Sequence, residues 1–286
     1  MASKTKIALI TGASSGFGLL IAVALASKGY RVVATMRNPE QQSQLMQESE
    51  RVGVCNNIEV VQLDVTDDSS IAEAVAHTID KYGRIDALVN NAGFAVGGVI
   101  EEVPMEAWRA QLETNFFGLV AVTRAVLPHM RSQREGAVIQ IGSVSGKVGL
   151  PGYGAYASSK FAIEGFSESL RHEVAPFGIR VYIVEPGAYR TSIWSKGFAN
   201  MHTQPNSPYE RQLNAVLHFS RKTADTAPPP QEVADLVARL ASQKSQRRLR
   251  YPVGHGSRLL IVAGKLLPWL WIEAAVRKVL KPPTIK

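Results

Sequence analysis

The sequence predicts an α/β fold: a seven-stranded parallel sheet, doubly wound, with helices on both faces. Short apolar runs of the kind that form buried strands alternate with helix-like stretches along almost the whole chain of 286 residues. A glycine-rich turn joins the first run to the first helical stretch. The composition, 45% hydrophobic and 20% charged, is that of an ordinary globular protein.

The seven predicted strands share short length, apolar character and a polar or glycine residue at one end. They span residues 6–11, 31–36, 58–63, 87–90, 137–141, 179–184 and 249–253, and the main helical stretches span 16–28, 39–50, 67–82, 105–132 and 153–175. No linker divides residues 1–256, which we expect to form one catalytic domain. Within it, the proline-containing segment 188–230 is predicted to be an irregular lid over the site. Residues 257–286 are predicted to form a basic, apolar helical extension.

Composition excludes several classes of protein. Cys55 is the only cysteine and the six histidines are scattered, so neither a disulfide scaffold nor a metal site is expected. Residues 241–286 contain ten Lys and Arg and one acid, Glu273, so this segment has a net charge of +9. The whole chain has a net charge of +8, and the charges of the first 240 residues therefore sum to −1. A nucleic-acid groove across the main domain is therefore not expected. The absence of a signal peptide and of a long apolar run predicts a soluble, cytoplasmic protein.

The turn after the first strand, Thr11-Gly-Ala-Ser-Ser-Gly-Phe-Gly18, is of the kind that binds a dinucleotide in Rossmann-type domains. Gly12 permits the tight turn, Gly16 lets the backbone approach a pyrophosphate at the helix N-terminus, and Gly18 allows close packing of helix on strand. The spacing differs from the commonest glycine fingerprint. In NAD-binding sheets an acid near the end of the second strand binds the ribose 2′-hydroxyl. Here the second strand ends in Met36, followed by Arg37, and no acid is present at that position. Because a guanidinium suits a 2′-phosphate, the sequence predicts NADP(H) rather than NAD(H).

A second group of polar residues suits proton transfer. Tyr156 and Lys160 lie four residues apart in a helical stretch, so both point to one helix face. A neighbouring ammonium favours the phenolate, which predicts a lowered pKa for Tyr156. Ser143 follows a strand, at the sheet edge where ligands bind, and Asn115 lies in the helical stretch after the Asn90-Asn-Ala-Gly93 strand end.

Together, and in their order along the chain, these motifs resemble those of the short-chain dehydrogenase/reductase family, in its common branch of about 250 residues. The matching elements are Thr11-Gly-x3-Gly-x-Gly18, Asp64, Asn90-Asn-Ala-Gly93, Asn115, Ser143, Tyr156-x3-Lys160, Pro186-Gly187 with Thr191, and the late Arg250-Tyr-Pro-Val-Gly254. The stretch 34–39 and the late strand are similar to members that act as 17β-hydroxysteroid and retinol dehydrogenases.

The resemblance implies roles for individual residues. Tyr156 would be the general acid, Ser143 would hydrogen-bond the carbonyl oxygen, Lys160 would bind the nicotinamide ribose, and Asn115 would hold a relay water. The implied cofactor contacts are Gly12, Ser14, Ser15, Gly16, Phe17, Gly18, Arg37, Asp64, Val65, Asn91, Ala92, Gly93, Tyr156, Lys160, Pro186, Gly187 and Thr191. The family also implies a homodimer or homotetramer formed through the helices near 105–132 and 153–175.

Aromatic and apolar side chains in the lid predict a bulky hydrophobic substrate. They are Tyr189, Ile193, Trp194, Phe198, Met201, Tyr209 and Phe219, and the segment 149–153 is expected to complete the wall. Three functions remain open: a carbonyl reductase, an enzyme that works physiologically as an alcohol dehydrogenase, and a non-catalytic cofactor sensor. Pro268 should split the C-terminal extension into two helices. Docking of that extension on the substrate cleft or a subunit interface is favoured over contact with a membrane surface.

Overall fold

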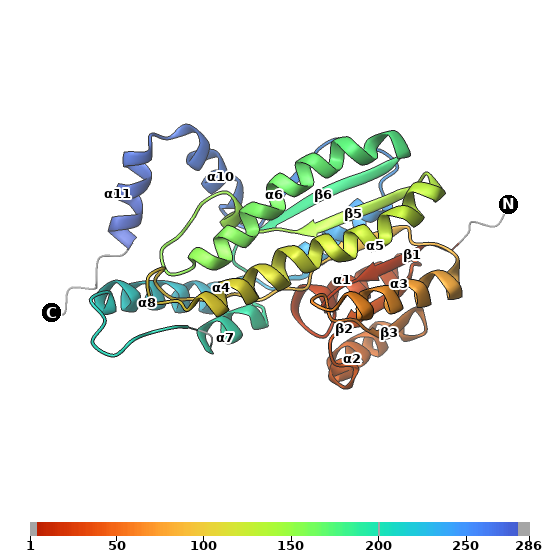
Figure 1. The fold of residues 1–286 in the computed structure, drawn as a ribbon, viewed down its shortest axis with the longest axis horizontal. Helices are drawn as coiled ribbons and strands as arrows, with labels where there is room; N and C mark the ends of the chain where they lie inside the picture. The colour runs from red at the N-terminus through yellow and green to blue at the C-terminus, as the bar shows by residue number, and fades with distance from the viewer. Residues whose placement is uncertain (1–4, 200, 280–286) are drawn as a thin grey trace.

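The sheet is built from seven parallel strands in the order β3-β2-β1-β4-β5-β6-β7, which confirms the predicted fold class (Figure 1). The computed structural model describes residues 5–199 and 201–279. The strands are β1 (Ile7–Ile10), β2 (Arg31–Met36), β3 (Ile58–Gln62), β4 (Ala87–Asn90), β5 (Gly136–Ile141), β6 (Ile179–Pro186) and β7 (Arg250–Val253). All seven lie within a few residues of the predicted runs.

Helices cover both faces of the sheet. Those that match the predicted stretches are α1 (Gly16–Ser27), α2 (Ser43–Val52), α3 (Asp68–Tyr82), α4 (Met105–Leu112), α5 (Gly118–Gln133) and α6 (Gly154–Val174). Short 3₁₀ turns occur at Pro39–Gln42, Cys55–Asn57, Val144–Gly146 and Ala175–Phe177. One hydrophobic core lies between the sheet and α1, α2 and α9 (Gln231–Ser242), and the other between the sheet and α3, α5 and α6. Strands buried on both faces read as continuous apolar runs, which is why the sequence revealed them.

The strand order reverses between β1 and β4, which are neighbours in the sheet although they are far apart in the chain. The β2–β3 half extends to one side of β1 and the β5–β6–β7 half extends from β4 to the other. Loops that leave β1 and β4 at their carboxyl ends therefore diverge and leave a crevice, the usual ligand site of an open parallel sheet.

The segment 188–230 is not irregular, and that part of the prediction is wrong. It contains α7 (Ser192–Ala199) and α8 (Glu210–Thr226). The prolines border these helices rather than interrupt them, and α8 buries one side through Leu213, Val216 and Ser220. Periodic burial of one face stabilises a helix against the proline-rich surroundings. The sequence reading also left α9 out; it follows directly after Pro230 and buries Val233 and Val237.

The C-terminal extension forms two helices, α10 (Ser257–Leu266) and α11 (Trp269–Val279), separated at Pro268 as predicted. In Figure 1 they lie at one end of the molecule, and α11 stands away from the sheet. Within residues 5–199 and 201–279, no helix combines the length and the apolarity needed to cross a bilayer.

Candidate active site

The glycine turn has the backbone that a pyrophosphate cradle requires. Gly12 and Gly16 have φ angles of 68° and 59°, in the left-handed region that glycine adopts without strain. A β-carbon at Gly12 would lie 2.8 Å from the Ala92 Cα atom. The N-terminus of α1 follows with free backbone N–H groups, which favour an anion. Ser14, Ser15 and Phe17 complete the turn.

Hydrogen bonds from the end of β4 fix this turn in place. The Asn91 side-chain amide donates to the Thr11 and Gly12 carbonyl oxygens, both at 2.9 Å. The Thr11 hydroxyl oxygen accepts from the backbone N–H groups of Asn91 and Ala92 at 3.0 Å. Gly18 is needed because a β-carbon there would lie 2.3 Å from the Gly12 oxygen. The predicted cofactor residues of β1, α1 and β4 are thus brought together.

The start of the segment 188–230 lies against the same turn. The Thr191 Cβ atom lies 3.7 Å from the position that a β-carbon on Gly16 would take, and the Ser15 and Ser192 hydroxyl oxygens are 3.1 Å apart. Pro186 ends β6, and the Gly187 N–H donates to Val253 at 2.9 Å. The carboxyl end of β6 therefore delivers this segment to the crevice from the opposite side.

The residues predicted to meet the adenosine end lie directly after β2 and after β3. Arg37 directly follows β2 and is exposed, in a position to meet a charged group in solution. One carboxylate oxygen of Asp64 accepts from the Thr66 N–H at 3.0 Å and from its hydroxyl at 2.8 Å. Val65 is buried, and its carbonyl oxygen lies 2.7 Å from where a Gly118 β-carbon would be.

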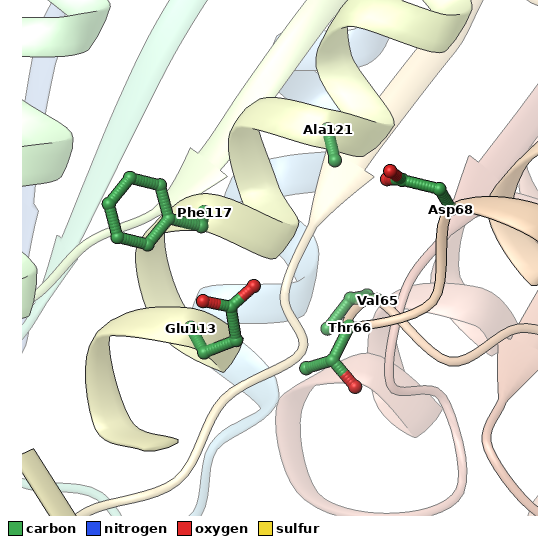
Figure 2. A pocket seen from close by; sticks show the side chains of 6 residues that line it. All are labelled: Val65, Thr66, Asp68, Glu113, Phe117 and Ala121. Atoms are coloured by element: carbon green, nitrogen blue, oxygen red, sulfur yellow. The ribbon is translucent and has the colours of Figure 1, made fainter. Parts of the chain in front are cut away.

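A surface hollow of about 350 Å³ adjoins this region (Figure 2). It lies between the loop after β3 and the helical segment that begins α5, and it is lined by Val65, Thr66, Asp68, Glu113, Phe117 and Ala121. Of these, only Val65 belongs to the predicted site. The catalytic side chains do not line this hollow.

Asn115 occupies a single π-helical turn, Glu113–Phe117, between α4 and α5. The sequence predicted one uninterrupted helix here; an extra residue per turn of this kind often marks a functional site. The side chain accepts from the Phe94 N–H at 3.0 Å and donates to the Phe94 oxygen at 3.0 Å and the Ser159 hydroxyl at 3.1 Å. Asn115 thus joins the loop after β4 to α6. Gly93 makes room for it, because a β-carbon there would lie 3.0 Å from Asn115 Oδ1.

Ser143, Tyr156 and Lys160 come together at the carboxyl end of β5. Ser143 follows that strand, is buried, and accepts from the Ser145 N–H at 3.1 Å. Tyr156 and Lys160 lie in the first turns of α6. The Lys160 Nζ atom lies 5.7 Å from the centroid of the Tyr156 ring and donates to the Ile141 oxygen at 2.8 Å.

The electrostatics of this group differ from the sequence prediction. Burial raises the pKa of Tyr156 above its ordinary value, and the Ser143 hydroxyl opposes that rise. Burial also lowers the pKa of Lys160 to about 8. Desolvation penalises the charged form of both groups, and the lowered pKa that we expected for Tyr156 is not found. A lysine with this pKa can exchange a proton near neutral pH.

The predicted wall residues differ in their surroundings. A β-carbon on Gly97 would lie 2.5 Å from the Met201 Cε atom, and the Trp194 indole N–H donates to the Tyr189 oxygen at 2.8 Å. Tyr153 donates to Ser220 on α8 at 3.0 Å. Tyr189 itself belongs to the core: it is 2% exposed, and its hydroxyl pairs with Glu232.

Two positioning residues were missed. Thr11 organises the end of β4, and its place directly before Gly12 at a strand end could have indicated it. Ser159 accepts from Asn115 and donates to the Tyr156 carbonyl oxygen at 2.7 Å, so it ties two predicted catalytic residues together. Nothing in the local sequence distinguishes Ser159 from a solvent-facing helix residue.

Comparison with known proteins agrees with this geometry. Residues 6–202 match the short chain dehydrogenase family, and the chain belongs to that family. It is 46% identical to the uncharacterised oxidoreductase YusZ of Bacillus subtilis, over 96% of this chain and 98% of that protein. It is 37% identical to human retinol dehydrogenase 8, over 88% and 84% of the two chains. A crystal structure of an actinorhodin polyketide ketoreductase variant with NADPH superposes with a TM-score of 0.76 at 32% identity, covering 90% of this chain and 99% of that one. The protein is an oxidoreductase of the short-chain dehydrogenase family.

Proposed function

We propose that the protein transfers a hydride between NADP(H) and a carbonyl compound or secondary alcohol, with a bulky apolar substrate. The main support is the grouping of Ser143, Tyr156 and Lys160 at the sheet edge where the glycine turn cradles an anion. The turn suits a dinucleotide because Gly12 and Gly16 hold it in a left-handed backbone directly before the N-terminus of α1, which has no side-chain cap. When bound there, the nicotinamide supplies or accepts the hydride.

The chain's own residues would handle the proton and orient the substrate. Tyr156 donates its phenolic proton to the carbonyl oxygen, and Ser143 donates a hydrogen bond to the same oxygen. Lys160, with a pKa near 8, lies beside the Tyr156 ring and can restore that proton. Asn115 would place the relay that connects Lys160 to solvent. The alcohol dehydrogenase direction uses the same groups in reverse, so it remains the alternative physiological reaction.

The preference for NADP(H) is supported by Arg37, which is exposed directly after β2 where a 2′-phosphate would lie. The NADPH in the related ketoreductase structure is consistent with it. A bulky apolar substrate is supported by the packing of Trp194 and Phe198, whose ring centroids are 6.1 Å apart, and of Met201 over the loop after β4. The names of retinol dehydrogenase 8 and the polyketide ketoreductase point to large substrates for those relatives.

A cofactor sensor without activity is the rival function. It has less support, because the full set of Asn115, Ser143, Tyr156 and Lys160 is present and Ser159 links Asn115 to Tyr156. A sensor would have no need of a buried lysine with a lowered pKa beside a half-buried tyrosine.

We also propose a cytoplasmic homodimer or homotetramer formed through α5 and α6. Phe117, just before α5, and Phe161 on α6 are 53% and 45% exposed, and exposed aromatic residues suit an interface. Light scattering of the purified protein tests this proposal, and a monomer at all concentrations would contradict it.

The test of function is cofactor oxidation by the purified protein across small ketones, aryl ketones, steroids and retinal, each with NADPH and with NADH. We expect turnover of a bulky ketone with NADPH preferred. Tyr156→Phe should abolish turnover and spare NADPH binding, whereas Arg37→Asp should weaken NADPH binding far more than NADH binding. Retained turnover in Tyr156→Phe would refute the mechanism. Equal effects of Arg37→Asp on the two cofactors would refute the cofactor preference. Absence of turnover despite NADPH binding would favour the sensor.

A further inference from the structure

The helices α10 and α11, with the Leu267-Pro268 link between them, form a C-terminal hairpin that packs on the core at one side only. Ser257 and Ile261 of α10 are buried, and a β-carbon on Gly264 would lie 3.0 Å from the Val148 Cγ2 atom. Val148 follows the 3₁₀ turn next to Ser143. The contact therefore anchors α10 beside the predicted substrate wall, and α11 extends beyond it (Figure 1).

The rest of the hairpin exposes apolar side chains that no other part of residues 5–199 and 201–279 covers. The apex, residues 266–271, is a run of six apolar residues, and its members Leu266, Leu270 and Trp271 are 77%, 73% and 67% exposed. The large exposed apolar residues among the described side chains of the hairpin are Leu259, Leu260, Val262, Leu266, Leu267, Trp269, Leu270 and Trp271. A soluble surface rarely carries so continuous an apolar patch unless something binds it.

The charges of the hairpin are mostly positive. Arg258 and Lys265 on α10, and Arg277 and Lys278 on α11, are all exposed. The one acid of the hairpin, Glu273, already lies 3.7 Å from Arg277. The hairpin thus presents a protruding apolar tip with tryptophans, bordered by cations. Tryptophan is enriched at the boundary between lipid headgroups and acyl chains, and lysine and arginine bind anionic headgroups.

We propose that the C-terminal hairpin docks the protein on the surface of an anionic lipid bilayer. The apex enters the headgroup region with Trp269 and Trp271, and Arg258, Lys265 and Lys278 contact lipid phosphates. The hairpin stays at the interface, since neither of its helices is long enough to cross a bilayer. Docking would turn the α10 side of the substrate wall toward the membrane. The proposal of lipid binding does not depend on what the substrate is.

Charge favours a lipid surface over a second copy of this chain. In a symmetric dimer the same patch meets itself, so the net positive charge of one hairpin would meet that of the other. An anionic bilayer neutralises them instead, and it accommodates a protruding tip without needing a matching groove. The chain's own cleft is not the occupant either, because the apex side chains remain exposed in the folded chain.

The test is co-sedimentation of the full-length protein with vesicles of phosphatidylcholine alone and of phosphatidylcholine containing phosphatidylserine. We expect binding to the phosphatidylserine vesicles, weakened by salt, and a blue shift of tryptophan emission. The double variant Leu266→Glu/Leu270→Glu changes only exposed residues and should lower the partition coefficient at least about tenfold. Val52→Glu, an exposed apolar residue at the end of α2, is the matched control and should bind as the unaltered protein does.

Failure of the unaltered protein to bind phosphatidylserine vesicles would overturn the proposal, and so would equal binding by the Leu266→Glu/Leu270→Glu variant. A variant that instead changes the oligomeric state in light scattering, with no vesicle binding by either protein, would assign the hairpin to an interface between copies. Ketone turnover in solution is measured separately. If vesicle binding is present and turnover is absent, the proposed activity fails and the docking stands.

Discussion

Two buried charged side chains lie one turn apart on α6, and the protein treats them in opposite ways. Lys160 faces the active site, and within the described part of the chain it has no carboxylate partner; it donates to the Ile141 oxygen at 2.8 Å. Glu164 pairs with Lys147, in the loop after Ser143, at 2.5 Å and with Arg250 at 2.8 Å. The unneutralised charge is unfavourable to bury, which lowers the pKa of Lys160 to about 8.

The neutralised charge serves a different purpose. Lys147 belongs to the loop after Ser143, Glu164 to α6, and Arg250 to β7, so the two ion pairs hold three separate segments together behind the active site. Fully buried Glu185, next to Pro186 at the end of β6, lies 3.9 Å from Lys147. Burial of Lys160 without a counter-charge is unfavourable for stability, whereas the ion pairs of Glu164 connect the loop after Ser143 to α6 and β7.

The largest expected effect is that of Lys160→Met. We expect turnover to fall at least about 100-fold, because the proton donor beside Tyr156 is lost. The free energy of unfolding should rise by about 1 kcal/mol, because a buried cation without a counter-charge is replaced by an apolar side chain of similar length. NADPH oxidation and thermal melting without cofactor measure the two effects. A less stable methionine variant would show that Lys160 stabilises the fold and would remove the contrast.

The second prediction concerns Glu164→Gln. The substitution leaves Lys147 without its closest carboxylate partner and leaves Arg250 paired only with the exposed Glu168. Removing one member of a buried ion pair leaves an uncompensated charge, so unfolding should require about 3 kcal/mol less free energy. Urea denaturation at neutral pH measures this change. A loss as small as that of a surface ion pair would mean that the cluster does not hold the loop in place.

Much of this arrangement could be predicted from the sequence, and the reasons are local. Strand β1, the Gly12–Gly18 turn and the Tyr156–Lys160 pair each depend on residues close together in the chain, and all three lie where they were expected. The charge cluster could not be predicted, because Lys147, Glu164, Glu185 and Arg250 lie on four segments that only the folded sheet brings together.

The substrate side was predicted less well for a similar reason. The helices α7 and α8 are stabilised by packing on the loops after β4 and β5 rather than by their own sequence, and Tyr189 joins the core through its hydrogen bond to Glu232 on α9. The π-helical turn at Asn115 is stabilised by the contacts of that residue with Phe94 and Ser159. These partners lie far away in the sequence, so the pattern of residues within one segment does not reveal them.

The third prediction is a pH dependence carried by Glu185. Burial, followed by the charge of the neighbouring Glu164, raises the pKa of Glu185 to about 8, while Lys147 and Arg250 oppose the rise. Because the folded state binds this proton more tightly than the unfolded state, its stabilising effect is complete below the usual carboxyl range near 4.5 and is lost as the pH rises through about 8. The melting temperature should fall over that interval.

Glu185→Gln replaces this group by a neutral side chain of the same size. We expect the variant to melt close to the unaltered protein at pH 5 and several degrees above it at pH 9. Melting curves at the two pH values measure the difference. If the difference in melting temperature between the two proteins is the same at both pH values, Glu185 does not titrate in this range.

The smallest expected effect is that of Glu168→Gln, which removes the other carboxylate on Arg250. Glu168 lies one turn beyond Glu164 on α6, but its side chain is 55% exposed, so water screens the ion pair. The Arg250 guanidinium lowers the pKa of Glu168, so the contribution of this pair is present above the ordinary carboxyl range and is lost in acid. The substitution should reduce the free energy of unfolding at neutral pH by no more than about 0.5 kcal/mol. Urea denaturation beside Glu164→Gln gives a direct comparison on one arginine. A loss for Glu168→Gln that equals the loss for Glu164→Gln would mean that burial of the carboxylate does not determine the strength of these pairs.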